Sequence, residues 1–182
     1  MTTANARGLR TLLGLAALFF VPLFLAFALY YGGGWRPAQS TNHGVLLAHP
    51  VKITASWPAE KWTLVQVGAG QCAEACREAL HVTRQTWLSL AKELDRVQRV
   101  FVAPAGCCEP RYFEQQHPSL VHIDAASPAG RGLLAALPPG TPDRTIYLID
   151  PLGNLIMTFD SRDNPKGLLA DLKKLLKLSH IG

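Results

Sequence analysis

The sequence lacks the short motifs that mark several large enzyme classes. It contains no GxSxG, no P-loop and no HExxH, and no pair of carboxylates stands at a spacing typical of acid–base catalysis. Runs of five or more lysines and arginines are missing as well. These absences exclude the hydrolases, nucleotidases and zinc proteases that are built on those motifs, and they argue against a nucleic-acid-binding tail.

Charged residues are balanced over most of the chain but missing from one stretch near the N-terminus. The 18 lysines and arginines face 13 aspartates and glutamates, and two of the arginines precede the uncharged stretch. Because the remaining surplus is small and dispersed, we expect no nucleic-acid partner. Residues 11–34 carry no charged side chain.

This uncharged stretch predicts a transmembrane helix over residues 11–31. Its core, LLGLAALFFVPLFLAFALYY, is almost wholly apolar, and about 20 such residues cross the ~30 Å hydrocarbon core of a bilayer as a helix. A cleaved signal peptide is the alternative, but its apolar region has only ~7–15 residues. Tyr30 and Tyr31 at the end of the run suit a membrane interface.

Two arginines predict the orientation of this span. Arg7 and Arg10 precede it with no acidic residue before it, so the tail of residues 1–10 is expected to stay in the cytoplasm. The chain would then be a single-pass protein of the inner (cytoplasmic) membrane with an exported C-terminal domain, periplasmic if the source is a bacterium. Disulfides form and persist in that compartment.

The rest of the chain predicts a linker and one folded domain. Glycine, proline, serine and asparagine cluster in residues 32–58, which is typical of a juxtamembrane linker, although VLLAHP and VKITASW are compatible with short strands. In the domain, residues 59–182, KWTLVQV and RVFVA predict strands. Apolar residues recur at helical spacing between them, from residue 73 to about 94. This order predicts a βαβ unit with a parallel strand pair.

The C-terminal part predicts a ββα unit. TIYLI and LIMTF predict strands joined by the turn DPLGN. A helix follows over residues 164–178, with Asn164 as its cap and Pro165 in its first turn. The predicted fold class is therefore α/β, with a βαβ…ββα central sheet flanked by helices and preceded by one transmembrane helix.

Two cysteines stand where the first strand gives way to a helix. Cys72 and Cys76 are four residues apart, which places both sulfurs on one face if the helix has begun. The amides at a helix N-terminus favour the thiolate form of Cys72. A thiolate is a nucleophile for disulfide exchange and a ligand for Cu(I), and a purely structural disulfide is the alternative.

The order of elements resembles a membrane-tethered thioredoxin-like domain, with cysteines at the first strand-to-helix turn. Within residues 61–178, CAEAC and YLIDPLGN resemble the Sco/SenC family, copper-handling assembly factors of cytochrome c oxidase. The resemblance implies a thioredoxin-like fold, copper bound by Cys72 and Cys76, and a respiratory oxidase subunit or its assembly factors as the partner.

The chain also departs from the Sco pattern. Sco proteins place a histidine ligand a few residues before the YLID strand, where this chain has Pro142, and no histidine occurs between Ser127 and Ser179. The pair Thr141–Pro142 resembles instead the cis-proline site of thiol-disulfide oxidoreductases, beside the reactive cysteines.

A second cysteine pair lies in the loop after the second predicted strand. In a thioredoxin-like fold this loop lies at the same edge as the first strand-to-helix turn, so Cys107 and Cys108 are expected near the first pair. Adjacent cysteines seldom bond to each other, because the geometry across one trans peptide is tight. His117 and His122 follow, and either would complete a copper site with two cysteines.

These observations leave three functions open. The first is an assembly factor for cytochrome c oxidase that delivers copper or reduces the thiols of a copper-site partner through Cys72 and Cys76. The second is a thiol-disulfide oxidoreductase, an enzyme with Cys72 as nucleophile, Cys76 as resolving thiol and Pro142 shaping the substrate groove. The third is a non-catalytic, membrane-anchored interaction domain.

Overall fold

The chain contains two compact units, Met1–Ser40 and Thr41–Gly182. The computed structural model describes five stretches of it: residues 3–32, 41–53, 60–68, 70–140 and 143–182.

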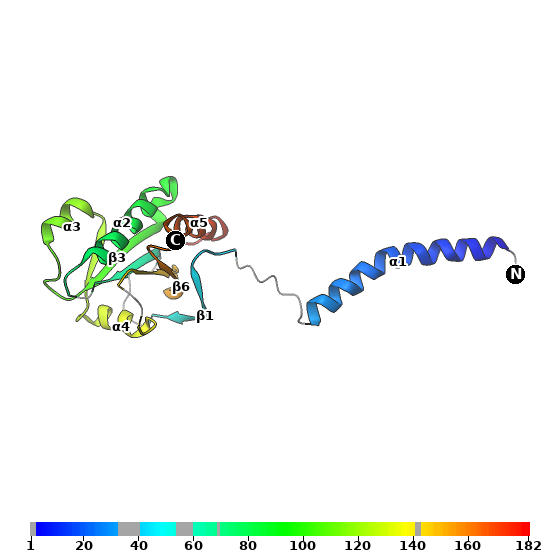
Figure 1. Cartoon of the computed structure of the whole chain (residues 1–182), viewed down its shortest axis with the longest axis horizontal. Coiled ribbons are helices and arrows are strands. Elements are labelled where there is room, and N and C mark those ends of the chain that lie inside the picture. The colour runs from blue at the N-terminus through cyan, green and yellow to red at the C-terminus, as the bar shows by residue number, and fades with distance from the viewer. Residues whose placement is uncertain (1–2, 33–40, 54–59, 69, 141–142) are drawn as a thin grey trace. The chain divides into compact units, whose positions relative to one another are not determined.

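Helix α1, Thr3–Tyr31, makes up the described part of the first unit (Figure 1). Within its segment Gly8–Tyr31, the most apolar window of 18 residues has a mean hydropathy of 2.6, and none of this window is buried within the structure. At 1.5 Å per residue the 24 residues of the segment are about 36 Å long. The described residues therefore contain one apolar helix long enough to cross a membrane. It begins at Thr3, before the predicted start at residue 11, and has Pro22 inside it.

The second unit is built on a six-stranded sheet in the order β1-β6-β5-β2-β3-β4. Its strands are β1 (Val45–Lys52), β2 (Trp62–Val67), β3 (Val97–Ala103), β4 (Leu120–Asp124), β5 (Thr145–Ile149) and β6 (Asn154–Asp160). Strands β2, β3 and β4 are parallel neighbours, whereas β5 pairs antiparallel with β2 and β6, and β1 pairs antiparallel with β6. The parallel β2–β3 pair and the β5–β6 hairpin are as predicted.

Helices cover both faces of this sheet (Figure 1). They are α2 (Glu74–Leu88), the 3-10 helix η1 (Ala91–Arg96), α3 (Pro110–Gln116), α4 (Pro128–Ala136) and α5 (Pro165–Leu178). Successive side chains of a strand point to opposite faces. Accordingly, Leu64 of β2 packs with Leu172 of α5, and Val65 packs with Leu133 of α4. The predicted α/β architecture is confirmed.

Some elements differ in extent from the sequence-based expectation. The helix predicted over residues 73–94 ends at Leu88, and a separate 3-10 helix begins at Ala91, which has φ of 52°. The turn-rich loop of residues 104–119 contains α3. Strand β1 lies within the stretch 32–58 predicted as a linker, where Val45 pairs with Thr158 of β6.

A third apolar cluster lies where β2 and β3 end. Leu80 of α2, Phe101 of β3 and Phe113 of α3 pack there with both Cys72 and Cys76. The cluster joins the first strand-to-helix turn to the loop after β3. It thereby positions the candidate site.

Candidate functional site: two disulfides at one edge of the sheet

The predicted pair Cys72 and Cys76 forms a disulfide, with an S–S distance of 2.02 Å and Cα atoms 5.2 Å apart. After β2 the chain turns through Gly70, whose φ of +67° suits glycine. Cys72 then lies just before the helix cap Ala73, and Cys76 is in the first turn of α2. Both cysteines are buried, at 6% and 4% exposure.

The start of α2 favours a thiolate when this disulfide is reduced. Ala73 provides no side-chain acceptor for the first amides of the helix, and the first four amides of any α-helix have no partner within it. These groups carry partial positive charge, which lowers the pKa of a nearby thiol. The guanidinium of Arg77 adds a full positive charge: it lies 5.2 Å from the centre of the Tyr112 ring and, with Cys72, lines a hollow at the protein surface.

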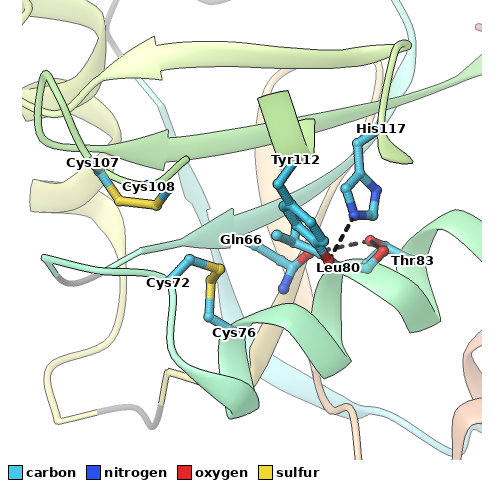
Figure 2. The surroundings of a disulfide bond; sticks show 9 residues. All are labelled: Gln66, Cys72, Cys76, Leu80, Thr83, Cys107, Cys108, Tyr112 and His117. Atoms are coloured by element: carbon cyan, nitrogen blue, oxygen red, sulfur yellow. Dashed lines mark hydrogen bonds between the residues drawn. A yellow bond between two sulfur atoms is a disulfide. The ribbon is translucent and has the colours of Figure 1, made fainter. Parts of the chain in front are cut away.

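Cys107 and Cys108 also form a disulfide, between adjacent residues (Figure 2). The expectation that such neighbours do not bond to each other is therefore wrong for this chain. The loop turns at Gly106, with φ of 79°, and the amide of Cys107 donates to the carbonyl of Pro104. Cys108 itself has φ of 74°, a left-handed conformation that costs a residue other than glycine about 1–2 kcal/mol.

The two disulfides meet at one hollow of about 300 Å³. Cys72 lines it from the turn before α2, and Cys108 and Tyr112 line it from the loop and α3. Figure 2 shows the Cys107–Cys108 bond across from the Cys72–Cys76 bond. A second hollow of about 470 Å³ is lined by Cys107, Cys108, His117 and His122. The structure therefore brings together both cysteine pairs and, on the far side of Cys108, both predicted histidines.

The two histidines differ in their surroundings. His117 is 3% exposed, and its ring nitrogens lie 3.4 Å from Arg99 Nη1 and 3.4 Å from Tyr112 Oη. Burial and the nearby positive charge of Arg99 lower the pKa of His117 to about 4. His122 of β4 packs edge-on against Phe113, and burial lowers its pKa. Both imidazoles are therefore neutral near pH 7.

A metal site with three ligands is not preformed in the described stretches. In these stretches no three His, Cys, Asp or Glu side chains are close enough together to hold a metal ion, and each of the four cysteines is bonded to another. Two-thiolate binding of Cu(I) by Cys72 and Cys76 fits the donor chemistry once their disulfide is reduced. Thr141 and Pro142 lie outside the described residues.

Sequence reasoning missed a set of buried polar residues beside the site. Arg99 of β3 is 1% exposed, donates to Ser119 Oγ at 2.9 Å, and lies with its guanidinium carbon 5.3 Å from the Trp87 ring centre. Gln66 of β2 accepts from Thr83 Oγ1 at 3.1 Å. The available signal was Gln66 within KWTLVQV and Arg99 at the start of RVFVA, each next to a run of apolar residues.

Fold and site together define a thioredoxin-like protein with a disulfide at the first strand-to-helix turn. Residues 62–179 match the family described as "Transmembrane-like, thioredoxin-like, C-terminal domain", and the chain belongs to this family. A search of curated protein sequences found no match.

Solved structures show the same fold. Yeast Sco1 is 16% identical, with a TM-score of 0.55 over 66% of this chain and 83% of that one. Yeast Sco1 with copper bound is 15% identical, with a TM-score of 0.54 over 66% and 81%. ScoI of Bradyrhizobium japonicum with copper bound is 21% identical, with a TM-score of 0.49 over 69% and 97%. The resemblance to Sco proteins is thus confirmed at the level of the fold.

Proposed function

We propose that this protein is a membrane-anchored, Sco-type thiol-disulfide exchange protein that reduces the copper-site cysteines of a partner during cytochrome c oxidase assembly. The observation that carries the proposal is the Cys72–Cys76 disulfide, placed at the N-terminus of α2 beside an open hollow. The resemblance of CAEAC and YLIDPLGN to the Sco/SenC family supports the choice of partner class, a respiratory oxidase subunit or its assembly factors.

Each cysteine has a distinct part in this reaction. Cys72 lines the hollow, so its thiolate attacks the partner's disulfide and forms a mixed disulfide while one partner sulfur leaves as a thiolate. Cys76 lies behind it in the helix, and its thiolate attacks Cys72 Sγ and releases the second partner sulfur. Two electrons pass to the partner, and the Cys72–Cys76 disulfide forms. Pro142 is proposed to shape the groove in which the partner lies.

Placement in the membrane belongs to the same proposal. The α1 helix anchors the chain in the inner membrane, and Arg7 and Arg10 keep its N-terminus in the cytoplasm. The thioredoxin-like domain then works in the periplasm, where partner cysteines become oxidised and need reduction.

A single-turnover assay tests the proposal. The full chain in detergent is reduced, freed of reductant, and mixed with an oxidised peptide that carries two cysteines. We expect Cys72→Ser to lower the rate of peptide reduction at least about tenfold, and Cys76→Ser to accumulate the mixed disulfide through Cys72. Ser89→Ala, an exposed change at the end of α2, serves as the control. Reduction at the wild-type rate by both cysteine variants would refute the proposal.

Copper delivery is the second candidate, because yeast Sco1 of the same fold is seen with copper bound. Cys72 and Cys76 would hold Cu(I) as thiolates, with Cys107, Cys108, His117 and His122 as candidate further ligands. Titration of the reduced full chain with Cu(I) is expected to saturate at one equivalent and to lose this binding in the Cys72→Ser/Cys76→Ser variant. Failure to bind stoichiometrically would remove this candidate and leave the exchange reaction in place.

A further inference from the structure

The Cys107–Cys108 disulfide has no part in the reaction proposed above, yet it borders the same hollow as Cys72. Cys108 lines both hollows at this edge of the sheet, whereas Cys72 is part of the first lining and Cys107 of the second. The sulfurs therefore follow the order Cys107, Cys108, Cys72, Cys76 from the second hollow to the interior of α2 (Figure 2).

Burial follows the same order. Cys107 and Cys108 are partly exposed, whereas Cys72 and Cys76 are buried. Both pairs contact one apolar cluster, with Phe113 in its core and Tyr112 packed against it. A dithiol arriving from solvent thus reaches the outer pair more readily than the inner one.

The positive charge at the hollow favours the thiolate form of the cysteines that line it. Arg77 lines it and is held against the Tyr112 ring, and a cation next to sulfur favours the thiolate over the thiol. Glu109 also lines the hollow. The first-turn amides of α2 add partial positive charge on the side of Cys72.

We infer that Cys107–Cys108 is a second redox pair, which accepts two electrons from an external dithiol and passes them across the hollow to Cys72–Cys76. This inference rests on the proposed function, because the inner pair is the one that then reduces the partner. The electron donor is a dithiol, either a small molecule or a cysteine pair of another exported protein.

The steps balance in atoms and electrons. A donor thiolate attacks Cys107 Sγ, Cys108 leaves as a thiolate, and the second donor thiol resolves the mixed disulfide, which leaves the donor oxidised. The Cys108 thiolate attacks Cys72 Sγ, and Cys76 leaves as a thiolate. Cys107 then attacks Cys108 Sγ and releases Cys72, so the outer disulfide re-forms. The inner dithiol holds the two electrons and takes up the two protons that the donor lost.

Trapping the intermediate tests this order directly. In the full chain in detergent, Cys107→Ser leaves Cys108 without its resolving partner, so we expect a Cys72–Cys108 bond with Cys76 as a free thiol. The matched variant Cys108→Ser leaves Cys107 free, on the side of the second hollow. After acid quenching and alkylation, peptide mapping by mass spectrometry is expected to find the bond to Cys72 at least about tenfold more often in Cys107→Ser than in Cys108→Ser. Equal amounts, or no bond between pairs in Cys107→Ser, would overturn the inference.

The number of peptide disulfides reduced per chain distinguishes this inference from the proposed function. The fully reduced chain is expected to reduce two equivalents of peptide disulfide, the Cys107→Ala/Cys108→Ala variant one, and the Cys72→Ser/Cys76→Ser variant none. One equivalent from the wild-type chain would overturn the relay and leave the proposed function standing. One equivalent from the Cys72→Ser/Cys76→Ser variant would show direct reaction of the outer pair and overturn the relay too. No reduction by the Cys107→Ala/Cys108→Ala variant, which keeps the inner pair, would refute the proposed function itself.

Discussion

Arg99 is a buried cation held mainly by neutral groups in the described part of the domain. Its guanidinium donates to Ser119 Oγ, lies 3.4 Å from His117 Nδ1 and stacks near the Trp87 ring. Burial, together with the charge of Arg84, lowers the pKa of Arg99 to about 10. At neutral pH Arg99 is therefore still charged, and His117 beside it must stay neutral to act as an acceptor.

Stability is expected to fall between pH 6.5 and pH 4 because of His117. Its pKa is about 4 in the folded domain against 6.5 as the ordinary value. Between these pH values the unfolded chain binds more protons than the folded one. The contribution of His117 to the free energy of unfolding is therefore complete above pH 6.5 and is lost as the pH falls toward 4. The loss amounts to at most about 3 kcal/mol. Urea unfolding of the full chain in detergent, at pH 7 and pH 4.5, measures it.

The His117→Gln variant is the control for this pH dependence, since glutamine does not titrate. Its free energy of unfolding is expected to change less between the two pH values than that of the wild-type chain. An identical pH dependence in both proteins would show that other groups cause the effect.

Asp171 ties the segment before β1 to helix α5. This carboxylate is 4% exposed, accepts from the backbone amides of His43 and Gly44 at 2.7 and 2.9 Å, and contacts His43 Nδ1 at 2.9 Å. Removing it takes the acceptor from both amides, of which that of Gly44 is buried and that of His43 is partly buried. We expect Asp171→Ala to lower the free energy of unfolding by about 2–4 kcal/mol, as measured by urea denaturation. The exposed Asp163→Ala change is expected to cost less than about 0.5 kcal/mol, and equal effects would contradict this account.

At the scale of single residues, the sequence predicted the inner cysteine pair but not its surroundings. Cys72 and Cys76 were recognisable because their spacing and their place before a helix restrict where the sulfurs lie. Arg99 was hidden, because a cation in a buried strand is stabilised by distant parts of the chain such as Trp87 and Ser119. The paired Cys107–Cys108 is accompanied by a left-handed backbone at Cys108, which the local sequence does not predict.

At the scale of elements, the break after α2 is the clearest local irregularity. Apolar residues continue at helical spacing to residue 94, yet α2 ends at Leu88 and Ala91 takes φ of 52°. An alanine in this conformation costs about 1–2 kcal/mol. Tertiary packing of Leu90 into the core against Leu64 and Val97 offsets that cost.

Ala91→Gly is therefore expected to stabilise the domain. Glycine takes a positive φ without the steric cost that alanine has, but its unfolded chain has more conformational entropy. The free energy of unfolding is expected to rise by up to about 1 kcal/mol as the net result. Ala135→Gly, at an exposed position inside α4, is the matched control and is expected to lose about 0.5–1 kcal/mol. Thermal and urea unfolding of the two variants check the opposite signs, and destabilisation by Ala91→Gly would contradict the expectation.

The elements that could be predicted are those whose residues show a regular apolar spacing or a recognisable cap. Both strand pairs and α5 follow from periodicity and caps: the side chain of Asn164 accepts from the amide of Gly167 at 2.8 Å, as its predicted cap role requires. Helix α3 has only seven residues, too few to show a period. Strand β1 contains a register shift between Leu46 and Val51, which blurs the alternation that marks a strand.

At the scale of the whole molecule, an apolar helix and a thioredoxin-like domain with two disulfides occur on one chain. The helix fits a membrane anchor by length and composition, and the family to which the chain belongs is described as transmembrane-like. Disulfide chemistry at two cysteine pairs requires a compartment in which disulfides persist. The side of the membrane on which the domain lies thus decides whether the proposed chemistry takes place.

Arg7 and Arg10 are expected to decide that side. Alkaline phosphatase fused after Gly182 is active only when exported, so the wild-type fusion in a bacterial host should be active. Arg7→Glu/Arg10→Glu removes the positive charge that retains the N-terminus, and we expect phosphatase activity per fusion molecule to fall about fivefold or more. Lys173→Glu/Lys174→Glu makes the same change of charge in α5, far along the chain from the span, and should leave the orientation unchanged. Equal activity of both variants would show that the arginines do not set the topology. An inactive wild-type fusion would place the cysteine pairs in the reducing cytoplasm, without the oxidising environment that the proposed reaction needs.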